Sequence, residues 1–107
     1  MRQVLKQYKI IKINFQEWIE KPGYAEVNPG GSVILPCRVL NKKGECRWER
    51  NSLPVGVHPG KYEWATGSGA EDCSLRIFTA EMEYDDGDWV CQVDALNNLW
   101  RSFFRVL

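Results

Sequence analysis

The sequence predicts an all-β fold, either a two-layer sandwich or a barrel. Turn signals built from Gly, Pro and Asn recur about every ten residues, as they do in all-β domains. The segments between the turns alternate apolar and polar side chains, which is the period of a strand. The 107 residues include five Trp and 44% apolar side chains. The chain therefore suits one domain with a packed core and is too apolar to be disordered.

The expected strands of the first half are separated by strong turn signals. Phe15, Trp18 and Ile19 precede the turn at 21–23, and residues 24–27 alternate up to the turn Asn28-Pro29-Gly30-Gly31. The next strand places Val33, Leu35, Cys37 and Val39 on one face. Pro36 has no N–H to donate, so we expect strand pairing to stop or switch there.

In the second half, each expected strand carries apolar residues on one face. Residues 45–50 place Cys46 and Trp48 together, and residues 61–64 form a short edge strand. Two later strands have inward faces made of Cys73, Leu75 and Ile77, and of Trp89, Cys91 and Val93. Asn97-Asn98 suits a hairpin turn before a last strand from about Trp100 to Val106.

The charge and hydropathy of the chain argue against a nucleic-acid binder and against a membrane-spanning segment. Fourteen basic and fourteen acidic residues give zero net charge, which argues against a broadly basic nucleic-acid binder. No apolar run is long enough to span a bilayer, so any membrane attachment belongs to a missing part of a longer chain. Residues 1–14 are basic, and Lys12 interrupts the apolar run that a secretory signal needs. We interpret this segment as a frayed terminus, the alternative being an amphipathic membrane-surface helix.

The four cysteines, Cys37, Cys46, Cys73 and Cys91, are the strongest compositional signal. An even count in so short a chain indicates disulfides and an oxidising compartment, with three possible pairings. Close cysteine pairs are absent and His58 is the only histidine, which argues against zinc and against a redox pair. The alternative is an intracellular domain with reduced thiols.

Three features together indicate a particular superfamily. They are the pair Cys37 and Cys91 at the ends of two strands expected to be buried, Trp48 on the strand after Cys37, and the motif Asp85-Asp86-Gly87-Asp88-Trp89-Val90-Cys91. The combination resembles the immunoglobulin superfamily over residues 15–107. The resemblance implies a two-sheet antiparallel sandwich, with a bridge between Cys37 and Cys91 and a Trp packed on it. We expect the core to contain Trp48, Leu35, Leu75, Ile77 and Trp89.

The motif departs from the superfamily pattern at one position. The corner residue two places before the second Cys is usually Tyr, whose hydroxyl bonds to nearby backbone. Trp89 stands there instead, and its indole can donate through one N–H but cannot accept. Trp89 preserves the aromatic packing, whereas the corner hydrogen bond is not predicted. Lys61 is a candidate partner for Asp85, the alternative being that both are solvated.

The second cysteine pair narrows the resemblance. Given the bridge between Cys37 and Cys91, Cys46 either pairs with Cys73 across the two sheets or both remain free thiols. The pattern of Glu-Cys-Arg at 45–47 and Asp-Cys-Ser-Leu at 72–75 resembles the outer domain of insect adhesion molecules such as fasciclin III. The phrases around Cys37 and Cys91 also resemble first domains of the irregular-chiasm and nephrin group. The short stretch between Trp48 and Cys73 favours an I-set or short variable-like layout.

Nothing in the sequence indicates catalysis. No nucleophile is accompanied by a placed base, and His58 lies in a Pro/Gly loop where we expect it to be solvated. We interpret the acidic residues near the corner motif as a solvated turn rather than a calcium site; they are Glu81, Glu83, Asp85, Asp86 and Asp88. We therefore expect no enzyme activity, cofactor, metal or small-molecule substrate.

The remaining candidate function is binding through the C-F-G sheet face of the expected sandwich. By alternation its outward residues are Arg47, Glu49, Val90, Gln92, Arg101, Phe103 and Arg105. An outward Phe among polar residues is typical of an interface, and Gln92 matches a face glutamine of the irregular-chiasm group. We expect an extracellular or cell-surface adhesion or receptor module that binds another immunoglobulin domain. The alternative is a structural spacer without a binding face.

Overall fold

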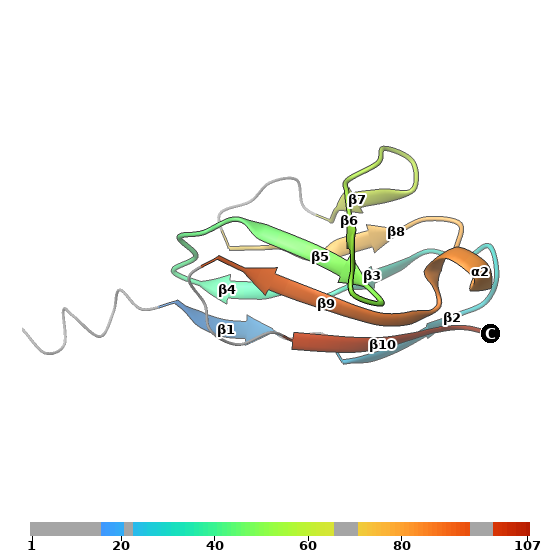
Figure 1. Ribbon diagram of the computed structural model, residues 1–107, viewed down its shortest axis with the longest axis horizontal. Coiled ribbons are helices and arrows are strands. Elements are labelled where there is room, and N and C mark those ends of the chain that lie inside the picture. Colours follow the sequence, from blue (N-terminus) through green and yellow to red (C-terminus); the bar gives the residue numbers. More distant parts are fainter. Residues whose placement is uncertain (1–15, 21–22, 66–70, 95–99) are drawn as a thin grey trace, which may run out of the picture.

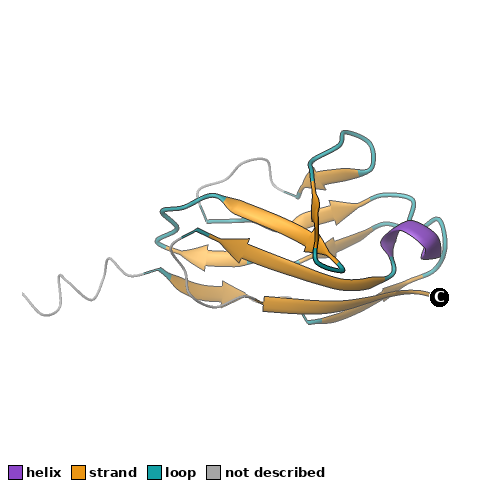
Figure 2. Cartoon of the chain, viewed as in Figure 1, coloured by secondary structure: helices purple, strands orange, loops and turns teal. Residues whose placement is uncertain are grey.

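The computed structural model describes residues 16–20, 23–65, 71–94 and 100–107. The expected segment 1–14 and the turn at Asn97-Asn98 lie outside the described residues. The elements in chain order are β1 (Glu17–Glu20), β2 (Tyr24–Val27), β3 (Val33–Leu35), β4 (Arg38–Leu40), β5 (Cys46–Arg50), β6 (Leu53–Val55), β7 (Tyr62–Trp64), β8 (Leu75–Ile77), α2 (Met82–Asp85), β9 (Gly87–Val93) and β10 (Trp100–Val106). Figures 1 and 2 show strands dominating the chain, with α2 as a single short turn of helix.

The strands form two layers, which confirms the sandwich. One layer is a five-stranded sheet in the order β2-β10-β9-β5-β6. The facing layer consists of the sheet β3-β8-β7 and the pair β1-β4. Every pairing is antiparallel except that of β2 with β10, which is parallel. The expected short edge strand is β7, at the edge of the three-stranded sheet.

Pro36 marks the point where one strand changes its pairing partner, as expected. Before it, β3 pairs with β8, and after it β4 pairs with β1. The interruption is bridged by Cys73 N–H, which donates to the Cys37 carbonyl at 2.7 Å. Because proline cannot donate to a ladder, the chain ends one strand at this residue and begins another.

The core lies between the layers and contains every residue expected in it. Leu35, Ile77 and Trp89 have no exposed surface, and Leu75 and Trp48 are each 2% exposed. Trp48 N–H donates to the Cys73 carbonyl at 2.8 Å, so the buried indole is satisfied. The rings of Trp48 and Trp89 meet edge to face at 6.4 Å between centroids. Alternation along the strands is sufficient to place these side chains inward.

In the described part of the chain, no helix has the length and apolar character needed to cross a bilayer.

Candidate functional site: the outer face of the five-stranded sheet

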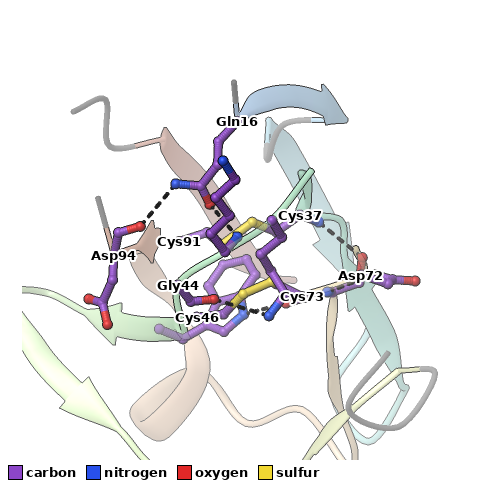
Figure 3. Close-up of a disulfide and its surroundings, with 12 residues drawn as sticks. Gln16, Cys37, Gly44, Cys46, Asp72, Cys73, Cys91 and Asp94 are labelled. Carbon is purple, nitrogen blue, oxygen red and sulfur yellow. Dashed lines mark hydrogen bonds between the residues drawn. A yellow bond between two sulfur atoms is a disulfide. The ribbon is translucent and has the colours of Figure 1, made fainter. Parts of the chain in front are cut away.

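The two disulfides position the strands that carry the candidate face (Figure 3). Cys37 is joined to Cys91 with Cα atoms 6.5 Å apart, and Cys46 to Cys73 with Cα atoms 6.0 Å apart. The first bridge is the one that the resemblance implied. The second confirms one of the two alternatives left open for Cys46 and Cys73, and the other alternative, two free thiols, is wrong. Each bridge crosses from one layer to the other, so β5 and β9 are attached covalently to the opposite sheet.

Strand register aligns the predicted partner-binding residues in rows across β5, β9 and β10. Arg47 lies opposite Gln92, and Glu49 lies opposite Val90. On its other side Val90 faces Arg101. The alternate residues of these strands, including Trp48 and Cys91, point into the core. The six residues named for partner binding therefore lie on one side of one sheet, and their role in binding stays a prediction.

Val90 corrects one expectation about this face. We expected an exposed apolar residue, but Val90 is only 9% exposed. It occupies the central strand of the sheet, with the longer side chains of Glu49 and Arg101 as its cross-strand neighbours. A short side chain between two long ones is covered by them, so Val90 supports the face rather than protruding from it.

Phe103 is the apolar side chain that protrudes from the face, and it has an aromatic neighbour that the sequence argument missed. Phe103 is 55% exposed, and its cross-strand partner on β2, Tyr24, is 64% exposed. The Tyr24 hydroxyl donates to Glu26 Oε2 at 2.9 Å. This hydrogen bond to a carboxylate favours the protonated phenol and raises the pKa of Tyr24. The alternation of residues 24–27 was visible in the sequence, but the parallel pairing of β2 with β10 was not.

The charges on this face are balanced. Arg47, Arg101 and Arg105 are offset by acidic residues at Glu26, Glu49 and Asp88. Arg47 Nη2 lies 3.0 Å from Asp94 Oδ1, with both side chains about half exposed. Exposed pairs of this kind contribute little to stability, so the charges are available to a partner at small cost.

The acidic residues near the corner motif do not behave as one solvated group. Asp85 has no exposed surface, which contradicts the expectation for that residue. Its carboxylate accepts from Lys61 Nζ at 2.6 Å, Tyr62 Oη–H at 2.6 Å and the Glu81 N–H at 2.7 Å. The ion pair between Lys61 and Asp85 is thus present, and its role is structural. Among the described residues, no group of acidic, His or Cys side chains is arranged to hold a metal.

Trp89 makes the corner hydrogen bond that was not predicted for it. Its indole N–H donates to the Asp85 carbonyl at 2.8 Å inside the core. The corner requires a donor to backbone a few residues upstream, and indole supplies one although it cannot accept. Trp therefore substitutes for the usual Tyr at this position.

A shallow groove at the β6 edge is the other concave feature of interest. It has a volume of about 320 Å³ and is lined by Leu53, Tyr62, Tyr84 and Arg50 among others. The Arg50 guanidinium already donates to the carbonyls of Asp86 and Glu83, and Tyr62 donates to Asp85. His58, also in the lining, is exposed as expected. The Arg50 guanidinium and the Tyr62 hydroxyl are thus engaged with the protein itself.

The two bridged sheets, the buried Trp48 and the aromatic corner define an immunoglobulin-like domain. Two proteins of related sequence indicate which kind of immunoglobulin-like domain this is. The irregular chiasm C-roughest protein of Drosophila melanogaster is 38% identical over 69 residues, 60% of this chain. Kin of IRRE-like protein 1 of Homo sapiens is 32% identical over 78 residues, 68% of this chain. The chain spans only 9% and 10% of the length of these relatives. No protein-family model matches it.

Solved structures agree with this assignment. Duf (Kirre) D1 superposes with a TM-score of 0.72 at 27% identity, covering 87% of this chain and 97% of that one. Rst D1-D2 superposes with a TM-score of 0.72 at 28% identity, covering 86% of this chain and 49% of that one. The titin I9-I11 tandem superposes with a TM-score of 0.74 and is 16% identical, covering 87% of this chain and 33% of that one. At this identity the likeness supports the fold alone. The chain is an immunoglobulin-like domain that resembles those of insect adhesion molecules.

Proposed function

We propose that this domain binds another immunoglobulin domain through the outer face of β5, β9 and β10, the C-F-G face. The observation that carries the proposal is the protruding Phe103, which is 55% exposed on an uncovered sheet and surrounded by polar side chains. Aromatic anchors with a polar surround are where binding energy concentrates in protein interfaces. The likeness to Duf (Kirre) D1 and Rst D1-D2 supports a protein partner of the same fold.

Charge balance supports a partner with a similar face. Three arginines and three carboxylates alternate over the sheet, so a second mixed-charge face can approach without net repulsion. The two bridges hold the strands of this sheet in place before binding. The proposed mechanism is therefore association of two preformed faces, with no chemical step.

An extracellular or cell-surface location follows from the same proposal. Disulfides persist in oxidising compartments and are rare in the cytosol. Two bridges in one small domain, together with the likeness to the irregular chiasm C-roughest protein, support this location.

The experiment measures binding of the folded domain to three probes by surface plasmon resonance and by sedimentation. The probes are a second copy of this chain, Duf (Kirre) D1 and Rst D1-D2. We expect at least one of them to bind, and Phe103→Asp to weaken that binding by a factor of about 30, the loss typical of a hot spot. The matched control is Ile34→Asp, because Ile34 is 46% exposed on β3 in the opposite layer.

Three outcomes contradict the proposal. A similar loss of binding in Ile34→Asp would mean that a charge anywhere on the surface is sufficient. A large drop in the melting temperature of Phe103→Asp would place Phe103 in the core. Failure of the wild-type domain to bind any of the three probes would favour a spacer domain without a binding face.

A further inference from the structure

The two disulfides differ in their access to solvent. Cys37 and Cys91, the inner bridge, have no exposed surface at either end. In the outer bridge, Cys73 is 1% exposed whereas Cys46 is partly exposed. Cys46 is also the first residue of β5, which starts near one end of the sandwich (Figure 1). Of the four cysteines, Cys46 is therefore the one that keeps exposed surface.

The surroundings of Cys73 are held by bonds that do not involve its sulfur. Its N–H donates to the Cys37 carbonyl at 2.7 Å, and its own carbonyl accepts from the Trp48 indole at 2.8 Å. The next residue, Ser74, accepts the Cys37 N–H on its hydroxyl at 3.0 Å. These three bonds tie the Cys73 segment to the inner bridge and to the buried Trp.

The strand that carries Cys46 is held in the same way. Cys46 lies in the β5 ladder opposite Val93 on β9, and the Asp94 N–H donates to the Glu45 carbonyl at 3.1 Å. Beside them, Arg47 forms its ion pair with Asp94. Both ends of the outer bridge thus have hydrogen bonds that do not involve the sulfur–sulfur bond.

We propose that the Cys46–Cys73 bridge is a thiol-exchange site that a dithiol opens at Cys46 while the domain stays folded. The thiolate of the dithiol attacks Cys46 Sγ, the bond to Cys73 breaks, and Cys73 leaves as a thiolate that takes a proton from water. The second thiol of the reagent then attacks the mixed disulfide and releases Cys46. Two electrons pass to the bridge and the reagent becomes a cyclic disulfide. Exchange rates depend on access to the sulfur under attack, and Cys46 is the one cysteine of the four with exposed surface.

The test is stepwise reduction of the native domain with dithiothreitol, quenched by alkylation and mapped by peptide mass spectrometry. We expect a window in which Cys46 and Cys73 are alkylated and Cys37 and Cys91 are not. Near-ultraviolet circular dichroism in that window should keep the signal of packed tryptophans. Opening of the inner bridge first, or release of all four thiols together with loss of that signal, would overturn the proposal.

A pair of single variants tests the accessible sulfur independently. Cys73→Ser leaves Cys46 free, whereas Cys46→Ser leaves Cys73 free at 1% exposure. With oxidised glutathione as the probe, we expect Cys46 to form the mixed disulfide at least about tenfold faster than Cys73, since reactivity follows exposure. Equal rates in two folded variants would contradict the assignment of Cys46 as the point of attack. If a variant does not fold, the stepwise reduction of the wild-type domain still decides.

Discussion

Lys61 Nζ lies 2.6 Å from Asp85 Oδ2, and the carboxylate of Asp85 has no exposed surface. A buried charge is tolerated when it is paired and its remaining lone pairs accept hydrogen bonds. Here the Tyr62 hydroxyl and the Glu81 N–H complete the set, while the Asp85 carbonyl accepts from Trp89. One residue thus connects β7, the turn before β9 and the corner tryptophan.

Asp85→Asn is expected to lower the free energy of unfolding by about 3 kcal/mol, because removing one partner of a buried pair leaves the other uncompensated. The amide also presents N–H groups to a site that contains only donors. Chemical denaturation measures the loss. The control is Asp94→Asn, whose partner Arg47 is exposed, and which should cost less than about 1 kcal/mol. Similar losses in both variants would contradict a special role for Asp85.

Tyr62 makes the stability depend on pH in the alkaline range. Burial and the hydrogen bond to Asp85 raise the pKa of Tyr62 well above its ordinary value of 10.0. The unfolded chain therefore loses the phenolic proton of Tyr62 at a lower pH than the folded domain does. The stabilisation that protonated Tyr62 gives the folded state is complete below pH 10 and is lost as the pH rises above it. Denaturation from pH 9 to 11 should show a steeper fall for wild type than for Tyr62→Phe. Parallel curves would show that another group is responsible.

The corner hydrogen bond is tested by two variants of equal bulk. Trp89→Phe removes the donor to the Asp85 carbonyl, whereas Trp89→Tyr keeps a ring of similar size and supplies a hydroxyl. Both variants lose packing relative to the wild-type domain, so the difference between their free energies of unfolding reports the hydrogen bond. We expect Trp89→Tyr to be more stable than Trp89→Phe by about 1 kcal/mol. Equilibrium unfolding in guanidinium gives the comparison. If the two variants are equally stable, the hydrogen bond contributes nothing measurable.

Gly87 is required by a close approach as well as by its backbone conformation. It has φ of +134°, and a Cβ there would lie 2.6 Å from the Asn51 Oδ1 that accepts the Asp88 N–H. Gly60 also has positive φ, +86°, but a Cβ there meets open space. Gly87→Ala should therefore destabilise more than Gly60→Ala by about 1 kcal/mol or more, as measured by melting temperature and denaturation. Equal effects would mean that backbone strain alone matters.

Tyr24 extends the proposed binding face onto β2. It lies beside Phe103 and is held by its hydrogen bond to Glu26. We expect Tyr24→Ala to weaken binding to the responsive probe about tenfold, a typical effect of losing an interface tyrosine. Leu53→Ala is the control, because Leu53 is 70% exposed on β6 at the far edge of the same sheet. A weaker effect for Tyr24 than for Leu53 would exclude β2 from the interface.

Local periodicity was enough to predict much of this molecule. Alternation separates the inward Leu35, Trp48 and Ile77 from the outward residues because successive side chains of a strand point to opposite faces. The missing N–H of Pro36 predicted a change of pairing for a reason confined to one residue. The cysteine spacing and corner motif, through the resemblance they carry, predicted the bridge between Cys37 and Cys91, and they left Cys46 and Cys73 either bridged or free.

What the tertiary structure alone decided depends on contacts between segments distant in the sequence. The sequence left Asp85 either solvated or paired with Lys61, and the contacts with Lys61 and with Tyr62 on β7 decided that it is buried and paired. Val90 is covered because β5 and β10 place longer side chains on both sides of it, and Tyr24 joins Phe103 because β2 pairs in parallel with the last strand. The sequence by itself determined which side of each strand is apolar. Exposure and charge environment were decided by which strands lie next to one another, and that is a property of the assembled sandwich.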